Sequence, residues 1–392
     1  MVVTDPAHVR EVFLAPHDML SAGEASEIFE PFVGRGSLFL LDGPMHARHR
    51  RLLSGPLREG RMQEYFDVIV DSVDRMTARY AGAEIAFYGA ARTMTLEVLV
   101  RVLFGPSGAA ALEELGARAR AMVDICAKPL LMIPAARVDL GRWSPWGRVL
   151  RTMRELDRRI YAAIAELRSV PANGTVLSLL LAARDEDGRP LSDTELRDEL
   201  VTLLIAGNET TATALAWTID ELHRAPHVLE RVRAELVRVG PLSAEKLDAL
   251  PELDACVREA LRLHPPIANT IRVVKRPFRL GPWELPPGAE VAPCMHLAHR
   301  DPELFPDPLS YRPERFRGTR IDPYAFFPFG GGSRRCMGMS LALFETKVAL
   351  ARLLTTHSFT HASRRRPRAR RRALLMAPDT GVPLRVERRE GR

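Results

Sequence analysis

A single cysteine near the end of the chain follows a glycine-rich loop with two arginines and precedes an apolar helical run. The loop is Phe329-Gly-Gly-Gly-Ser-Arg-Arg-Cys336-Met-Gly338, and the apolar run spans 341–354. Glycines allow backbone N–H groups to turn toward the sulfur, and the positive end of the following helix favours an anion. The chain is therefore expected to fold so that an ionised thiolate at Cys336 can reach a metal.

The size and cysteine content of the chain limit the kinds of protein it can be. Its 392 residues are 46% hydrophobic, which is enough for a large core. No run of about 18 apolar residues is present, and no charged segment followed by an apolar block begins the chain, so neither a membrane-spanning helix nor a signal peptide is expected. The four cysteines form no C-x-x-C pair, which argues against structural zinc. Low cysteine use without an export signal predicts a cytoplasmic protein.

Positive charge is concentrated in one short segment. The chain has 56 Lys and Arg against 49 Asp and Glu, a formal net charge of +7, and Arg364–Arg372 holds much of the excess. A nucleic-acid patch, a docking surface for an acidic partner and a solvated loop are three explanations for such a run. No interleaved aromatic residue or nucleic-acid motif accompanies it, so the solvated loop is favoured and no nucleic-acid partner is expected.

Apolar periodicity predicts a mainly α protein with small β-sheets, folded as one unit. Helical spacing dominates the first three hundred residues, at 62–80, 93–103, 150–167 and 226–239. The segment 277–293 has proline, glycine and short alternating runs, which predict strands and turns. A further strand pair is predicted at 373–377 and 382–386, joined by a turn at 378–381.

A long helix with a polar defect is predicted after Ser192. Ser192 and Glu195 have the spacing of a capping box, and no proline breaks the thirty residues that follow. Its middle reads Ala206-Gly-Asn-Glu209-Thr210-Thr between apolar stretches. A glycine there costs about 1 kcal/mol relative to alanine, and a buried acid is unfavourable without a partner. The favoured interpretation is a local widening where a ligand approaches, with Glu209 and Thr210 handling protons or water. The alternative is a surface stripe with Glu209 in solvent.

A carboxylate and a guanidinium three residues apart lie on a second predicted helix, 251–264. Glu259 and Arg262 are neighbours at this spacing, which also occurs elsewhere in the chain where surface pairs are the ordinary explanation. Position distinguishes this pair, because Pro265 follows closely and Arg315 lies downstream. Arg315 is predicted to complete a buried Glu–Arg–Arg brace.

Cationic side chains occur at four further places that suit a dianionic cofactor. His46 and Arg50 are four residues apart at a predicted helix start, Arg272 lies in a strand-like stretch, and Arg334 lies two residues before Cys336. Each is an ordinary surface residue when taken alone. Together with the cysteine loop they can donate hydrogen bonds to carboxylates such as haem propionates.

These segments together resemble the cytochrome P-450 family, the haem-thiolate monooxygenases. The family's motif F-x-x-G-x-R-x-C-x-G is matched by Phe329, Gly332, Arg334, Cys336 and Gly338. The defect in the long helix matches the family's oxygen-activation motif, and the Glu259–Arg262–Arg315 brace matches its E-x-x-R arrangement. His46 and Arg50 match a propionate-binding motif of soluble bacterial members. The resemblance covers essentially the whole chain, and the cysteine motif is highly specific.

The resemblance implies a fold and a reaction. It implies the cytochrome P-450 fold as a single haem-containing domain over residues 1–392, with a short N-terminal part and no fused reductase. Cys336 would ligate the iron of haem b, and Glu209 with Thr210 would supply protons for O2 activation. One oxygen atom would enter a C–H bond by hydroxylation, or an epoxide would form. The other residues that would bind haem are His46, Arg50, Arg272, Phe329, Arg334 and Gly338.

Partners and a substrate class also follow from the resemblance. Electrons from NAD(P)H would arrive through a ferredoxin reductase and a ferredoxin, because no flavin or iron–sulfur module is visible in the sequence. The substrate would be a small lipophilic molecule, such as a terpenoid, steroid or fatty acid, bound by a monomer. The residues expected to face it are Leu203, Leu204, Ala206, Ile267, Ala268, Asn269 and Thr380.

Three alternatives stay open at this point. A haem-thiolate peroxygenase would use hydrogen peroxide directly and would not need the acid and hydroxyl at Glu209 and Thr210. A haem-binding sensor or carrier would leave the same pair unexplained. A helical interaction protein, in which Cys336 is merely buried, would bind no haem.

Overall fold

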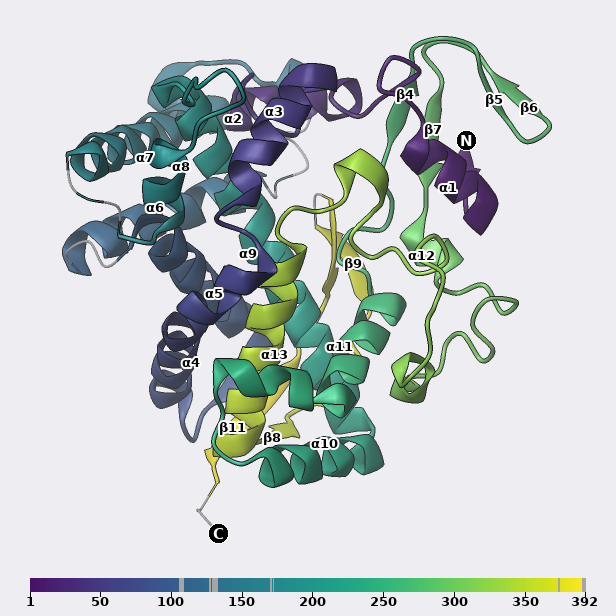
Figure 1. Cartoon of the computed structure of the whole chain (residues 1–392). Coiled ribbons are helices and arrows are strands. Elements are labelled where there is room, and N and C mark those ends of the chain that lie inside the picture. Colours follow the sequence, from purple (N-terminus) through teal and green to yellow (C-terminus); the bar gives the residue numbers. More distant parts are fainter. Residues whose placement is uncertain are drawn as a thin grey trace.

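A computed structural model of the chain describes residues 1–105, 109–126, 128, 133–169, 171, 173–372 and 374–389 (Figure 1). Helices form most of it, as the apolar periodicity predicts. The α-helices are α1 (Pro6–Leu14), α2 (Glu30–Val33), α3 (Gly43–Ser54), α4 (Phe66–Tyr80), α5 (Phe87–Phe104), α6 (Ala109–Cys126), α7 (Pro145–Arg168), α8 (Val176–Ala182), α9 (Asp193–Arg224), α10 (Pro226–Val239), α11 (Pro251–Leu263), α12 (Met295–Ala298) and α13 (Met339–Thr356). Short 3-10 turns are η1 (Glu24–Phe29), η2 (Glu59–Tyr65), η4 (Pro134–Ala136), η5 (Gly141–Trp143), η6 (Ala244–Ala249), η7 (Pro313–Phe316) and η8 (Gly332–Arg334).

Short strands form small sheets beside the helices. The strands are β1 (Val2–Val3), β2 (Leu20–Ser21), β3 (Glu84–Ala86), β4 (Arg272–Val274), β5 (Phe278–Leu280), β6 (Trp283–Leu285), β7 (Glu290–Pro293), β8 (His357–His361), β9 (Ala369–Arg372), β10 (Leu375–Pro378) and β11 (Pro383–Arg388). Their orders are β1-β7-β4-β2, β3-β11-β8, β5-β6 and β10-β9. In the first of these, β1 runs parallel to β7, so the start of the chain is held beside residues 290–293.

Helix α9 runs through the middle of the molecule (Figure 1). The predicted capping box is present, since Ser192 Oγ accepts from the Glu195 N–H and the Glu195 carboxylate accepts from the Ser192 N–H. The helix spans 32 residues and stays α-helical through the polar defect. Helix α5 packs along it, and a Cβ at Gly207 would lie 3.1 Å from Leu99 Cδ2. The glycine therefore lets α5 approach closely, whereas the sequence interpretation was a widened helix.

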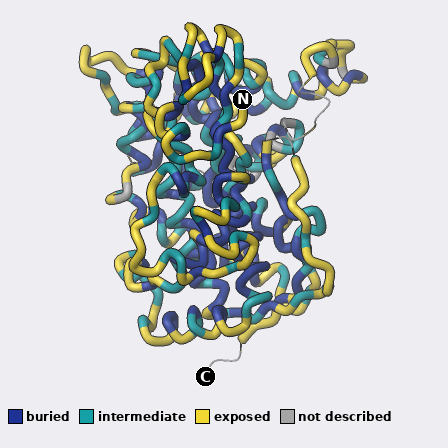
Figure 2. The backbone as a smooth tube through the Cα atoms, turned by 90° about the vertical axis from the view of Figure 1, so that its right-hand side faces the viewer, coloured by how far each residue is buried: buried dark blue, intermediate teal, exposed yellow. Residues whose placement is uncertain are grey.

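The interior is largely helical. Figure 2 shows buried backbone in dark blue gathered in the middle of the molecule, with exposed segments around it. Residues of α4, α5, α9, α11 and α13 share one apolar core. A second core joins α1 to β4 and β7 through Val9, Phe13, Val274 and Val291. Within the ranges described, no helix combines the length and apolarity needed to cross a bilayer.

The last strands pair differently from the prediction. Strands β9 and β10 pair antiparallel, with Leu375 opposite Arg372, and β11 pairs with β8 and β3. The turn at 378–381 therefore links two sheets and does not close a hairpin. The predicted solvated loop at Arg364–Arg372 also ends in a strand, β9. Local turn residues indicate where the chain bends, but they do not specify which strand pairs with which.

Candidate active site

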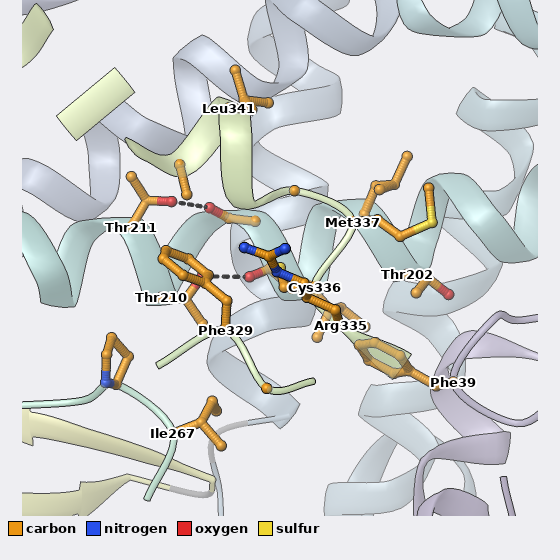
Figure 3. Close-up of a pocket in the computed structure, with 18 of the residues that line it drawn as sticks. Phe39, Thr202, Thr210, Thr211, Ile267, Phe329, Arg335, Cys336, Met337 and Leu341 are labelled. Carbon is orange, nitrogen blue, oxygen red and sulfur yellow. Dashed lines mark hydrogen bonds between the residues drawn. The ribbon is translucent and has the colours of Figure 1, made fainter. Parts of the chain in front are cut away.

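A cavity of about 440 Å³ lies between α9 and the loop that carries Cys336. Figure 3 shows this loop beside α9, with Thr210 and Thr211 on the helix and Phe329 next to Cys336 on the loop. Most of the wall is apolar, and it comes from α3, α5, α9, α13, the segment after α11 and the β9–β10 strands. Apolar wall residues that the sequence did not single out include Phe29, Leu38, Phe39, Leu99, Leu103 and Leu375.

Glycine shapes the cysteine loop at the position where it touches α1. Gly332 has a φ of +61°, and a Cβ there would lie 1.9 Å from the Phe13 carbonyl oxygen. Only glycine meets both requirements without displacing the backbone. The Cys336 N–H donates to the Phe329 carbonyl oxygen at 2.9 Å and closes the loop. The loop thus holds Cys336 at the cavity wall.

The thiol of Cys336 lies in a crowded but not sealed environment. It has accessible surface, and it is among the residues that line the cavity. Burial raises the pKa of the thiol, whereas the Gly338 N–H, Arg50 and Arg335 lower it. Burial outweighs the donor and the two cations, so the pKa of the thiol is raised overall and the thiol is protonated near pH 7.

Three of the predicted cationic residues line the cavity without a carboxylate partner among the described residues: His46, Arg50 and Arg272. Burial, followed by Arg334 and Arg50, lowers the pKa of His46 to about 4, so its ring is neutral near pH 7. Arg272 is 7% exposed, its Nη1 donates to the Ile271 carbonyl oxygen, and burial lowers its pKa to about 10. A buried guanidinium is costly without an anion, so this side of the cavity fits an anionic group.

Glu209 and Thr210 both line the cavity from α9. The Glu209 side chain is 6% exposed, and its Oε1 lies 2.6 Å from Arg92 Nη2 and 3.3 Å from Arg372 Nε. Burial raises its pKa, and the two arginines oppose that rise. Glu209 is therefore not a solvated surface acid. Thr210 Oγ1 donates to the Ala206 carbonyl oxygen at 2.6 Å.

Comparison with known proteins identifies this arrangement. The family model described as cytochrome P-450 matches residues 1–384. The chain belongs to the cytochrome P-450 family. Membership implies a haem-thiolate monooxygenase that uses O2, and it agrees with a thiol at the wall of an apolar cavity beside buried cations.

Individual relatives agree with this assignment of the chain to the cytochromes P-450. The chain is 35% identical over 388 residues to "Putative cytochrome P-450 137" of Mycobacterium tuberculosis, covering 98% of this chain and 80% of that protein. It is 33% identical to "Putative cytochrome P-450 138" of Mycobacterium bovis, over 99% and 86% of the two chains. The structure described as "Retinoic acid bound cyanobacterial CYP120A1" is 26% identical, with a TM-score of 0.88, covering 99% of this chain and 88% of that one.

The brace of this cytochrome P-450 is assembled as a buried cluster. Arg262 Nε and Nη2 donate to the two Glu259 carboxylate oxygens at 2.7 and 2.8 Å, and both side chains are 0% exposed. Arg315 Nε lies 3.4 Å from Glu259 Oε1. Arg262 also donates to the carbonyl oxygens of His299, Pro308 and Ser310. The brace thus fastens α11 to the segment that leads toward the cysteine loop.

The Arg334 guanidinium group already has hydrogen-bond partners within this cytochrome P-450. Its Nη1 donates to the Leu38 carbonyl oxygen at 2.9 Å, and its Nη2 contacts the Leu41 carbonyl oxygen and the Asp42 carboxylate. Sequence spacing could not show this, because Asp42 precedes Arg334 by almost three hundred residues. Arg334 therefore fixes the loop to the start of α3 and faces the cavity as a partnered cation.

Only some of the residues expected to face substrate line the cavity. Leu203, Ala206 and Ile267 line the cavity. Among the described wall residues, Leu204, Ala268, Asn269 and Thr380 are absent. Leu204 points into the helical core. In the last part of the chain, the wall is formed by Arg372, Leu374 and Leu375. The apolar Leu-Leu-Met that follows the arginine run was the signal in the sequence that could have located this contribution.

Proposed function

We propose that this chain inserts one oxygen atom of O2 into a C–H bond of a small lipophilic substrate, by hydroxylation or epoxidation. The observation that supports this most directly is the position of Cys336, which lines an apolar cavity that Thr210 and Glu209 also line. Bound haem b would supply the oxygen-activating chemistry. Cys336 would hold the iron, with Phe329 and Gly338 beside it, and His46, Arg50 and Arg272 would bind the propionates together with the partnered Arg334.

The side chains of α9 would manage protons. Thr210 Oγ1 donates to the Ala206 carbonyl oxygen, so the hydroxyl oxygen has lone pairs free to accept from a donor in the cavity. Glu209, the next residue along α9, is buried with a raised pKa, which makes it an acid that can hold and return a proton. We assign proton transfer to Glu209 and proton positioning to Thr210.

The apolar wall favours a lipophilic substrate, in the class of terpenoids, steroids and fatty acids. The retinoic acid in the relative CYP120A1 supports this class. The match to the family accounts for residues 1–384, and no flavin or iron–sulfur motif is visible in residues 1–392. We therefore propose that electrons from NAD(P)H arrive through a ferredoxin reductase and a ferredoxin. We propose that the enzyme acts as a monomer with one haem domain and receives its electrons from these partners.

Carbon monoxide tests the assignment of the iron ligand. The purified protein, expressed with added haem and then reduced under carbon monoxide, is expected to show the strongly red-shifted absorption band of a thiolate-ligated ferrous haem. The apolar cavity gives the haem and the gas a common site beside Cys336. A folded protein that binds no haem would support a helical interaction protein instead. A folded, haem-loaded protein without the band would contradict Cys336 as the ligand.

Replacing Thr210 with alanine is expected to separate electron use from product formation. The variant should retain haem, because Thr210 contacts only α9 through its hydroxyl. We expect product per electron pair to fall about tenfold, less than the roughly hundredfold contribution of a typical general acid, because Glu209 remains. The missing product should appear as released hydrogen peroxide. Thr213→Ala, which removes a buried α9 hydroxyl that donates to Glu209 O, is the matched control. Unchanged coupling in Thr210→Ala would show that the proton-positioning role assigned to Thr210 is wrong.

A further inference from the structure

A four-residue charge network surrounds Glu209. Glu209 Oε1 lies 2.6 Å from Arg92 Nη2 on α5 and 3.3 Å from Arg372 Nε on β9. Asp124 on α6 reaches the same two guanidinium groups, with its Oδ1 2.5 Å from Arg92 Nη2 and 3.1 Å from Arg372 Nη2. Two acids and two arginines from four elements thus form one cluster. Arg372, the last arginine of the basic run, belongs to this cluster, although the sequence predicts a solvated loop there.

The hydrogen bonds of this network go to Asp124. Arg92 and Arg372 each donate one to Asp124 Oδ1. Glu209 Oε1 is buried and, among the described residues, has no hydrogen-bond partner, so its contacts with the arginines lack an aligned N–H. Aligned, charge-assisted hydrogen bonds are the stronger kind. Asp124 therefore holds both guanidinium groups by hydrogen bonds, whereas Glu209 Oε1 contacts them closely without an aligned N–H.

The network also connects the interior with the surface. The Glu209 side chain is 6% exposed and the Asp124 side chain is 44% exposed, with Arg92 and Arg372 between them. The groups that face Glu209 are Tyr88 and Arg92 from α5, Asp124 from α6 and Arg372 from β9. Arg92 and Arg372 lower the pKa of Glu209 against the effect of burial, whereas Asp124 raises it. Burial raises the pKa of Tyr88, so the phenol stays neutral near pH 7.

We propose that Asp124 is a positioning residue for the proton supply of this enzyme: by holding the guanidinium groups of Arg92 and Arg372, it leaves Glu209 free to take up a proton and pass it toward Thr210. The inference rests on the proposed roles of Glu209 and Thr210. The step moves a proton only, which Glu209 regains from the solvent side, so no oxidant or reductant enters it. Because Arg372 also lines the cavity, the proton supply depends on where the β9–β10 strands lie against α6.

Two substitutions should shift the titration of Glu209 in opposite directions. In Asp124→Asn the acceptor of both arginines loses its negative charge, so the arginines interact more strongly with Glu209 and its protonation midpoint should fall by about one pH unit. In Arg372→Gln one opposing cation is removed, so the midpoint should rise by a similar amount. The readout is the infrared band of the protonated carboxyl group, assigned by its loss in Glu209→Gln. This measurement needs no turnover.

Matched controls separate this effect from a general change of charge. Glu114→Gln removes a carboxylate of the same helix that pairs with Arg159 at the surface, and Arg370→Gln removes an exposed cation from the same strand. Neither should move the carboxyl band. Coupling of electron use to product should change with the protonation midpoint of Glu209. At a pH near the wild-type midpoint, Asp124→Asn should release severalfold more peroxide per electron pair. Arg372→Gln should stay coupled to higher pH. Asp124→Glu should restore the wild-type midpoint.

The outcomes distinguish this inference from the proposed function. If Thr210→Ala uncouples the enzyme but Asp124→Asn and Arg372→Gln leave the band and the coupling unchanged, the proton roles of Glu209 and Thr210 stand and the role of Asp124 is wrong. Shifts of the same sign in both variants would also overturn it. If Thr210→Ala stays coupled while the band shifts as described, the network controls the protonation of Glu209, and the proton-positioning role assigned to Thr210 is wrong. Should Asp124→Asn not fold, Arg372→Gln alone must still raise the midpoint.

Discussion

Arg262→Ala is expected to abolish the haem-loaded protein. The substitution leaves the Glu259 carboxylate buried with the more distant Arg315 and the Arg312 N–H, and it removes the donor to three backbone carbonyl groups. Breaking a buried ion pair by removing one partner costs about 3–5 kcal/mol. Whole domains are stable by only about 5–15 kcal/mol, so a large part of the margin would be lost.

Chemical denaturation and the haem content after purification measure this effect. Arg258→Ala is the matched control, because Arg258 lies on the same helix and pairs with Asp254 at 2.6 Å, but 44% of its side chain is exposed. Exposed pairs contribute about 0–1 kcal/mol, so the control should bind haem normally. An Arg262→Ala protein that is folded and replete with haem would show that the brace is dispensable. Arg262→Lys should restore only part of the stability, because an ammonium group cannot reproduce the forked hydrogen bonds.

Cys336→Ser is expected to remove monooxygenation completely while leaving the protein folded. A serine hydroxyl is not ionised near neutral pH and cannot push electron density toward bound oxygen as a thiolate does. The loop should survive, because the Cys336 N–H still donates to the Phe329 carbonyl oxygen and Gly332 still fits against Phe13. The absorption band under carbon monoxide should be lost, and product should fall below detection with the redox partners present.

A cysteine elsewhere in the chain provides the comparison. Cys294 is buried, and its Sγ donates to the Ala268 carbonyl oxygen at 3.5 Å, a weak bond that a serine hydroxyl can replace. Cys294→Ser should retain both the band and the activity. Retention of the red-shifted band in Cys336→Ser would require another thiolate at the iron, and it would overturn the assignment of the ligand.

The parts of the site that sequence could predict are those in which neighbouring residues determine the geometry. The Cys336 loop is specified by glycines within a few positions of the sulfur, and the start of α9 is specified by Ser192 and Glu195. Glu259 and Arg262 meet because one helical turn separates them. In each case the local chain fixes the contact, and the fold class follows from the same apolar periodicity.

The parts that sequence missed depend on contacts between distant segments. Arg92 and Glu209 are separated by more than one hundred residues, so no spacing rule links them. The same holds for Arg334 and Asp42. Strand pairing failed for the same reason, because the turn at 378–381 carries strong local signals but no information on the partner of β11. Gly207 was interpreted from the sequence as a local widening of the helix, whereas its close contact with Leu99 follows from the packing of α5.

The close fit of Gly332 to Phe13 has a practical consequence for work with this enzyme. Helix α1 supports the cysteine loop, and β1 just before it pairs in parallel with β7, so residues 2–14 are built into the scaffold. Any substitution that moves α1, even one far from the cavity, would therefore also move the loop that carries Cys336.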